Sequence, residues 1–154
     1  MVKKLTHHFF SSGIITLVMT RLGVGLFVLA VGLVVGYLTD TIIDKFGHTR
    51  SGTNYDRNRI THSTLTAPLI GIGLGSPLFF FFNFSSFPAL AGFLAGCSHI
   101  FCDSFSQSGI FAPFSRWRLC RFSFDDWRIN TILSLSGAAL LVYGFLEILK
   151  NAKF

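Results

Sequence analysis

The sequence is poor in charged residues, and this shortage argues against a soluble protein. Only 13% of its 154 residues are Asp, Glu, Lys or Arg, whereas 51% are hydrophobic, and the mean hydropathy is +0.58. Internal repeats and low-complexity tails are also missing. Such a composition is typical of a chain that lies in lipid. We therefore predict one integral membrane domain that covers residues 1–154.

Cysteine is scarce as well. The three cysteines, Cys97, Cys102 and Cys120, form no CxxC motif, and their odd number argues against a disulfide framework or a Cys-based metal site. The GxSxG motif of serine hydrolases is missing. Ser63 directly follows His62, but adjacent residues on a helix do not face each other. A serine nucleophile is therefore not indicated.

The net charge of +6 does not mark a nucleic-acid-binding protein. Lys and Arg are scattered over turns and chain ends and form no stripe, so anionic lipid headgroups explain them better. We expect membrane lipids as partners and no nucleic acid. Lys3 and Lys4 precede an apolar run as in a signal peptide, but no small-x-small cleavage site precedes Arg21. We expect the N-terminus to be retained.

Five apolar runs predict the architecture. They cover roughly 7–20, 23–43, 62–83, 87–105 and 129–149. About 20 helical residues cross the ~30 Å hydrocarbon core of a bilayer, so four runs are long enough and the first is short. The prediction is an all-α polytopic membrane helix bundle with about five transmembrane helices.

Two interpretations of the first runs remain open. Arg21 and the following "LGVG" can close a tight turn between two helices. Alternatively, 9–39 is one long tilted helix that buries Arg21 at a cost of about 2.5–3.5 kcal/mol. The turn is favoured, because five crossings place most Lys and Arg residues on the side of the N-terminus. By the positive-inside rule, that side is cytoplasmic.

All five histidines and three of the seven acidic residues fall at this same predicted end. They are His7, His8, Asp40, Asp44, His48, His62, His99 and Asp103. The two aspartates Asp40 and Asp44 are spaced i, i+4, so they share a helical face and repel each other. A divalent cation removes that repulsion, and mixed His and Asp ligation suits zinc or a related first-row metal.

Each part of this set also has a structural interpretation. His99 and Asp103, again spaced i, i+4, can form an ion pair. Asp40 can cap the start of a short helix, and Asp44 can pair with Lys45 or Arg50 at the headgroups. His8 and His48 can be interfacial. Because ionisable residues inside membranes are costly and usually functional, we favour one functional cluster over several separate structural roles.

Four segments carry a family resemblance. "THHFFSSG", "DTIIDKFGH", "RNRITHS" and "GCSHIFCDSFSQSGIF" occur in an order that resembles a mainly archaeal family of small membrane proteins, from His7 to about Asn130. That family is similar in turn to bacterial membrane-bound metal-dependent hydrolases, whose "PFS…RFS" stretch resembles "APFSRWRLCRFSF" at 112–124. The resemblance implies a metal site distantly like that of zinc-dependent phospholipase C and P1 nuclease.

By these motifs, the resemblance gives the metal ligands His7, Asp40, Asp44, His62, His99 and Asp103, with His48 as an addition and with His99 and Asp103 as catalytic residues. The chain departs from the pattern at two places. Thr39-Asp40 stands where bacterial relatives show Pro-Asp, and Gln107 stands where archaeal members tend to carry an acidic residue. If that acidic residue is catalytic, this protein is impaired or specialised.

The predicted function is metal-dependent hydrolysis of a phosphoester-bearing lipid or lipid-linked substrate at the cytoplasmic face. A divalent metal, with zinc expected first, activates water in such sites. Arg116, Arg118 and Arg121 would hold a substrate phosphate, although anchoring at the headgroups is their simpler role. The main alternative is a non-enzymatic structural protein of a cell or virion membrane, in which the cluster staples helices. An ion or proton pathway is less favoured, because the opposite half has few ionisable residues.

Overall fold

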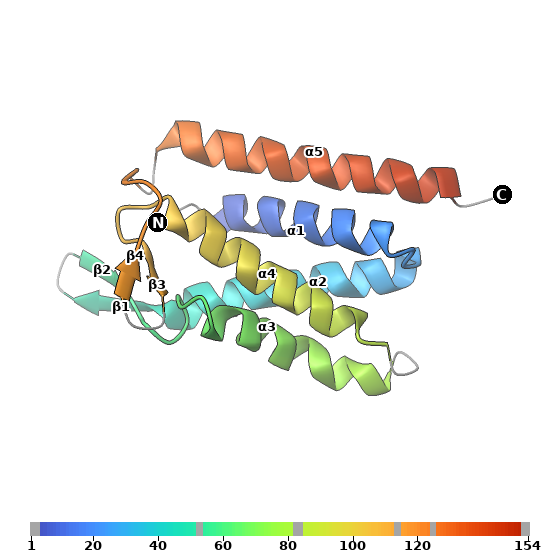
Figure 1. Cartoon of the computed structure of the whole chain (residues 1–154), viewed down its shortest axis with the longest axis horizontal. Coiled ribbons are helices and arrows are strands. Elements are labelled where there is room, and N and C mark those ends of the chain that lie inside the picture. The colour runs from blue at the N-terminus through green and yellow to red at the C-terminus, as the bar shows by residue number, and fades with distance from the viewer. Residues whose placement is uncertain (1–3, 52–53, 82–84, 113–114, 124–125, 152–154) are drawn as a thin grey trace.

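The computed structural model describes residues 4–51, 54–81, 85–112, 115–123 and 126–151. This part of the chain is a helical bundle with two short β-hairpins at one end (Figure 1). Its helices are α1 (Lys4–Arg21), α2 (Leu26–Gly47), α3 (Thr66–Gly75), the 3-10 helix η1 (Ser76–Phe80), α4 (Phe87–Ser104) and α5 (Trp127–Asn151). The antiparallel hairpins pair β1 (His48–Ser51) with β2 (Asn54–Arg57) and β3 (Ile110–Ala112) with β4 (Ser115–Trp117).

The connection between α1 and α2 is a tight turn, so the alternative of one helix over 9–39 is wrong. α1 ends at Arg21, and Gly23 has a φ of +70°, a conformation that residues with a Cβ rarely adopt. Arg21 is exposed at the turn, and its guanidinium donates a hydrogen bond to the Tyr143 hydroxyl. The arginine therefore avoids the burial that a single long helix would impose.

Two helices of the described residues, α2 and α5, are long and apolar enough to cross a membrane. The prediction of about five transmembrane helices is therefore not supported. The run predicted at 62–83 divides into turns, a ten-residue α3 and η1, where Pro77 lacks the N–H that a continuing α-helix would use. α1 and α4 have 18 residues each, but their polar residues, such as His7, His99 and Asp103, oppose the apolar character of these helices.

Small residues bring the helices close together. A Cβ on Gly71 of α3 would collide with the backbone of Gly92 on α4, and the reverse also holds. α1 and α5 approach in the same way at Gly13 and Gly137. Such close backbone contacts are typical of helix pairs in membranes. α4 contacts α1, α2 and α3, so side chains on several of its faces meet neighbouring helices.

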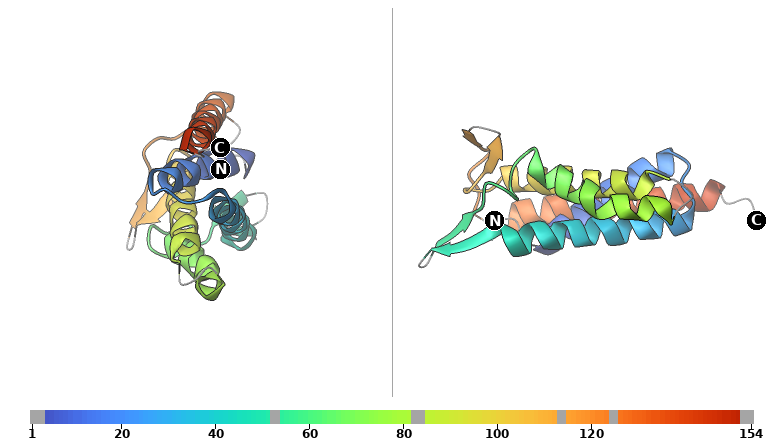
Figure 2. Two further views of the ribbon diagram at one scale, coloured as in Figure 1. Left: turned by 90° about the vertical axis from the view of Figure 1, so that its right-hand side faces the viewer. Right: turned by 90° about the horizontal axis from the view of Figure 1, so that it is seen from below.

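The two ends of the bundle bury different kinds of side chain. One part of the interior is apolar and contains Ile15, Met19, Leu29 and Ala91. Toward the end that carries the hairpins, the interior contains histidine, aspartate and arginine instead. Figures 1 and 2 show both hairpins and the start of α1 at this end, and the end of α5 at the other. The hairpin end therefore contains the candidate functional residues.

Candidate metal centre

Three helices and one connecting segment bring six predicted ligands into one buried cluster. The ligands are His7 on α1, Asp40 and Asp44 on α2, His99 and Asp103 on α4, and His62 between β2 and α3. None of them is more than 4% exposed. His48, at the start of β1, is half-buried beside them. His62 was expected on a helix, but it lies in turns before α3, where its carbonyl accepts a hydrogen bond from the Phe111 N–H.

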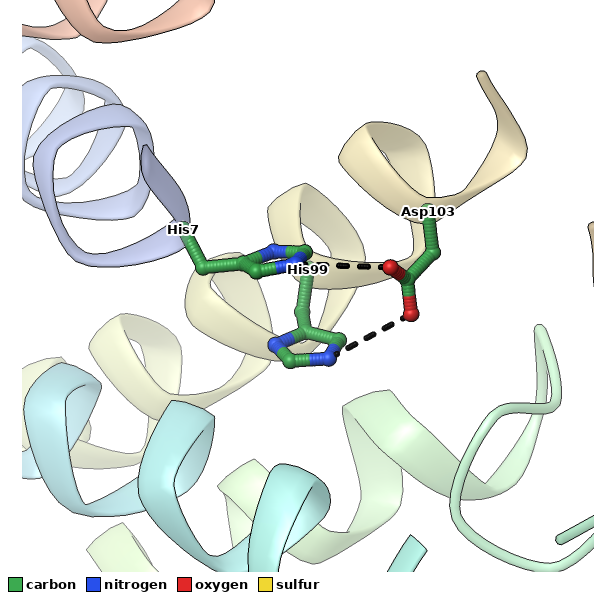
Figure 3. A group of neighbouring side chains, drawn as sticks. All are labelled: His7, His99 and Asp103. Carbon is green, nitrogen blue, oxygen red and sulfur yellow. Dashed lines mark ion pairs between the residues drawn. The ribbon is translucent and has the colours of Figure 1, made fainter. Parts of the chain in front are cut away.

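The first group of close ligand atoms comes from His7, His99 and Asp103 (Figure 3). His7 Nε2 lies 3.3 Å from Asp103 Oδ1, and His99 Nε2 lies 3.5 Å from Asp103 Oδ2. The two imidazole rings are stacked, with their centroids 4.0 Å apart. Among the described residues, neither ring nitrogen of His7 nor Nε2 of His99 makes a hydrogen bond. One nitrogen of a neutral His7 ring and Nε2 of a neutral His99 ring could therefore each offer a lone pair to an ion.

The second group comes from Asp44, His48 and His62, whose ligand atoms all lie within 4.8 Å of one another. Both carboxylate oxygens of Asp44 and the Nε2 atoms of His48 and His62 are buried without a hydrogen-bond partner in the described part of the chain. The two groups touch. His62 Nε2 is 3.4 Å from Asp103 Oδ2, and His99 Nε2 is 3.7 Å from Asp44 Oδ1.

Hydrogen bonds fix which nitrogen of two histidines is free. His99 Nδ1 donates to Asp40 Oδ1 at 3.1 Å, and His48 Nδ1 donates to the Asp44 carbonyl at 2.7 Å. Since an oxygen acceptor holds the Nδ1 proton in both cases, Nε2 keeps its lone pair in the neutral ring. Burial lowers the pKa of His62 to about 2, so this ring is neutral. For His99, burial is outweighed by the Asp103 and Asp40 carboxylates, which raise its pKa to about 10, so a metal that binds Nε2 would displace a proton. Neutral rings with an oriented second nitrogen are the form in which histidine binds metals.

Asp40 supports this arrangement from outside both groups. One of its oxygens accepts the His99 Nδ1 proton, and the other accepts a hydrogen bond from the Ser11 hydroxyl. The second oxygen also lies 3.4 Å from Nδ1 of His8, which is partly exposed and packs against Tyr37. Because both Asp40 oxygens have polar neighbours, its position is that of a carboxylate that orients a ligating histidine.

Arg57 is a buried member of the site that the sequence analysis did not identify. Its Nη2 forms an ion pair with Asp103 Oδ1 at 2.5 Å, and its Nη1 donates to the Gly109 carbonyl at 2.6 Å and to the Ser106 hydroxyl at 2.7 Å. The pKa of the Arg57 guanidinium is lowered overall, because the effect of burial exceeds the opposing effect of the Asp103 and Asp44 carboxylates. Arg57 thereby joins the first hairpin to α4 and holds one oxygen of Asp103.

The spacing of the ligand atoms fits a first-row metal. The distances of 3.3 to 3.7 Å between ring nitrogens and carboxylate oxygens are found without hydrogen bonds at the Nε2 atoms. Ligands on a tetrahedral zinc with bonds near 2.1 Å lie about 3.4 Å apart. Three buried carboxylates face one buried guanidinium, an excess of two negative charges before any histidine is protonated. A divalent cation would balance them.

The three arginines expected at a substrate phosphate lie at the hairpin end but outside the cluster. Arg116, Arg118 and Arg121 are exposed. The Arg116 guanidinium lies over the Phe111 ring at 5.0 Å, and Arg118 donates to the Gln107 carbonyl. Gln107 itself is exposed.

Comparison with known proteins gives one family. The model of the family described as "YdjM inner membrane protein" matches residues 1–152. No curated protein and no solved structure matches the chain.

Proposed function

The chain belongs to the YdjM inner membrane protein family, and from this premise we propose that its buried His/Asp cluster is the metal centre of a membrane-bound hydrolase. The reaction is hydrolysis of a phosphoester, and the substrate is a lipid or a lipid-linked molecule. The observation that carries the proposal is the set of buried Nε2 atoms and carboxylate oxygens that have no hydrogen-bond partner among the described residues. Several of these atoms face one another at 3.3 to 3.7 Å without hydrogen bonds, and a cation between them would satisfy them.

His7, His99 and Asp103 would hold the metal. A divalent ion of the zinc type, when bound, supplies Lewis acidity toward a phosphoryl oxygen and makes water nucleophilic near neutral pH. Asp40 keeps the His99 ring in the tautomer that leaves Nε2 free. Arg57 keeps Asp103 ionised and fixes its Oδ1, so that Oδ2 faces His99 and His62. These residues thus hold the ligating atoms in place before substrate arrives.

The substrate class follows from where the cluster lies in a membrane protein. Among the described residues, Arg116, Arg118 and Arg121 lie at the hairpin end with the half-exposed Trp117. Arginine binds phosphate through paired hydrogen bonds, and tryptophan prefers the membrane interface. A phosphate at headgroup level would therefore meet both the arginines and the metal centre.

We propose that this end faces the cytoplasm, together with the N-terminus. Most basic residues of the described helices and hairpins lie at the hairpin end, whereas Arg21 and Lys150 lie toward the other. This asymmetry is the one that the positive-inside rule associates with the cytoplasmic side.

The rival proposal is a structural protein in which the metal only staples helices. Both proposals predict bound metal, so activity must separate them. The experiment is phosphate release by detergent-purified protein, with zinc and with a chelator, from a panel of phospholipids and polyprenyl phosphates. We expect zinc-dependent release that Asp103→Asn abolishes while the variant stays folded. Stoichiometric metal without any product from the panel would favour the structural role.

A further inference from the structure

We infer that the cluster binds two divalent cations, and that Asp44, His48 and His62 form the second position. The inference rests on the proposed function, because it divides the ligands of the same centre. It goes beyond that function by assigning a separate ion to the group on α2, β1 and the segment before α3.

The number of ligands exceeds the three or four that one zinc ion typically takes. Asp40 is occupied by His99 and Ser11, and six candidate residues remain, in two groups of three. Catalytic zinc typically takes three protein ligands and keeps one position open. Two groups of three therefore correspond to two ions, each with a position left for water or substrate.

Asp103 lies between the two groups. Its Oδ1 is 3.3 Å from His7 Nε2, and its Oδ2 is 3.4 Å from His62 Nε2. Oδ2 also lies 3.5 Å from His99 Nε2 of the first group, whereas Oδ1 is paired with Arg57. Asp103 Oδ2 therefore faces a histidine of each group, which is the place of a carboxylate shared between two ions. Ions in two-metal hydrolytic sites are about 3.5–4 Å apart, a separation that a single carboxylate can span.

The residues of the second group pack closely against the end of α2. A Cβ on Gly47 would run into the His62 ring and the Thr61 hydroxyl, so only glycine at this position lets the ring approach α2. Thr61 Oγ1 lies 3.0 Å from His62 Nδ1, and the Asp44 carbonyl accepts the His48 Nδ1 proton. Each histidine of the group is therefore oriented through Nδ1, and each leaves a buried Nε2 without a hydrogen-bond partner among the described residues.

The charge of the cluster indicates what a second ion would add. With neutral histidines, three carboxylates and the Arg57 guanidinium leave two negative charges, which one divalent cation neutralises. A second cation would give the centre two positive charges. In a buried site this excess favours an anionic phosphoryl group over a neutral carboxylic ester.

The test is the number of ions per chain in the detergent-purified full chain after equilibration with Zn²⁺, measured by elemental analysis. His7→Ala and His48→Ala each remove one ligand from one group, and His8→Ala is the matched control, because His8 belongs to neither group. We expect two ions in the wild type and in His8→Ala, and one ion in each of the other two variants. His48→Gln keeps most of the side-chain volume and should also retain one.

A second readout does not depend on activity. Mn²⁺-loaded wild-type protein should give the electron paramagnetic resonance signal of a coupled pair, and His48→Ala should give that of an isolated ion. One ion per chain in the wild type would overturn the inference, and hydrolysis by that one-ion protein would leave the proposed function standing. Folded wild-type protein without any bound zinc would overturn both.

Discussion

His99 on α4 donates its Nδ1 proton to the Asp40 carboxylate on α2, across 3.1 Å in the interior of the bundle. This bond joins two helices and, at the same time, points His99 Nε2 toward Asp103 and Asp44. The same contact therefore serves the packing of the helices and the geometry of the candidate metal centre.

Asp40→Asn tests this dual role. An asparagine of the same shape no longer holds the His99 ring by charge, and its amide can favour the wrong tautomer. Loss of such a supporting carboxylate typically weakens metal binding about 10- to 100-fold. Competition with a zinc chelator measures this affinity. Glu147→Gln, the same chemical change near the other end of the bundle, is the control and should leave the affinity unchanged. Equal affinities in both variants would show that Asp40 does not orient the centre.

Arg57→Ala should destabilise the protein strongly. The change leaves the Asp103 carboxylate buried without its ion-pair partner, and such losses cost about 3–5 kcal/mol. Arg59→Ala is the matched control, because Arg59 is exposed and its guanidinium only lies over the Phe111 ring, a contact worth about 1 kcal/mol or less. Unfolding in mixed detergent micelles measures both. Similar midpoints for the two variants would contradict a structural role for the buried arginine.

Metal removal should lower stability as well. Without a cation, the three buried carboxylates are balanced only by Arg57 and by protonated histidine. A ligand that binds only the folded state stabilises it by about 2.7 kcal/mol at a concentration 100 times its Kd. We expect the thermal midpoint to fall on addition of a chelator and to recover with added Zn²⁺. A thermal midpoint that changes with neither the chelator nor Zn²⁺ would argue against a bound metal.

The packing of α3 on α4 gives a prediction that is independent of the metal. Gly71→Ala places a Cβ against the Gly92 backbone and should cost about 1–3 kcal/mol. Gly73→Ala is the control on the same helix, because no atom of the described residues lies within 4 Å of its Cβ position. Alanine there should be neutral or stabilising by up to about 1 kcal/mol. Equal stability of the two variants would show that α3 does not pack in this way.

Much of the fold could be predicted because hydrophobic runs and turn residues are local signals. The runs at 23–43, 87–105 and 129–149 correspond to α2, α4 and α5 within a few residues. The strand pairs β1–β2 and β3–β4 were not predicted, because neither has the alternating apolar pattern of a half-buried strand. The expected five crossings are not supported, because apolar composition alone does not reveal that a run divides, as it does before Pro77.

Most of the candidate site was also visible in the sequence, since helical spacing places Asp40 with Asp44 and His99 with Asp103. Arg57 could not be assigned to the site from the sequence, because its partners lie 46 to 52 residues away in the chain. One signal could have found it: three buried carboxylates need a counter-charge, and "RNRITHS" offers arginine beside a ligand histidine.

Whether the cluster binds metal at all is the point on which the account depends most directly. The decisive measurement is the metal content of detergent-purified wild-type protein after exposure to Zn²⁺ and removal of free ion, beside His99→Ala. We predict stoichiometric zinc in the wild type and a marked loss in the variant, whose missing Nε2 faces both Asp103 and Asp44. Folded wild-type protein with no bound zinc, or equal zinc in His99→Ala, would contradict the account.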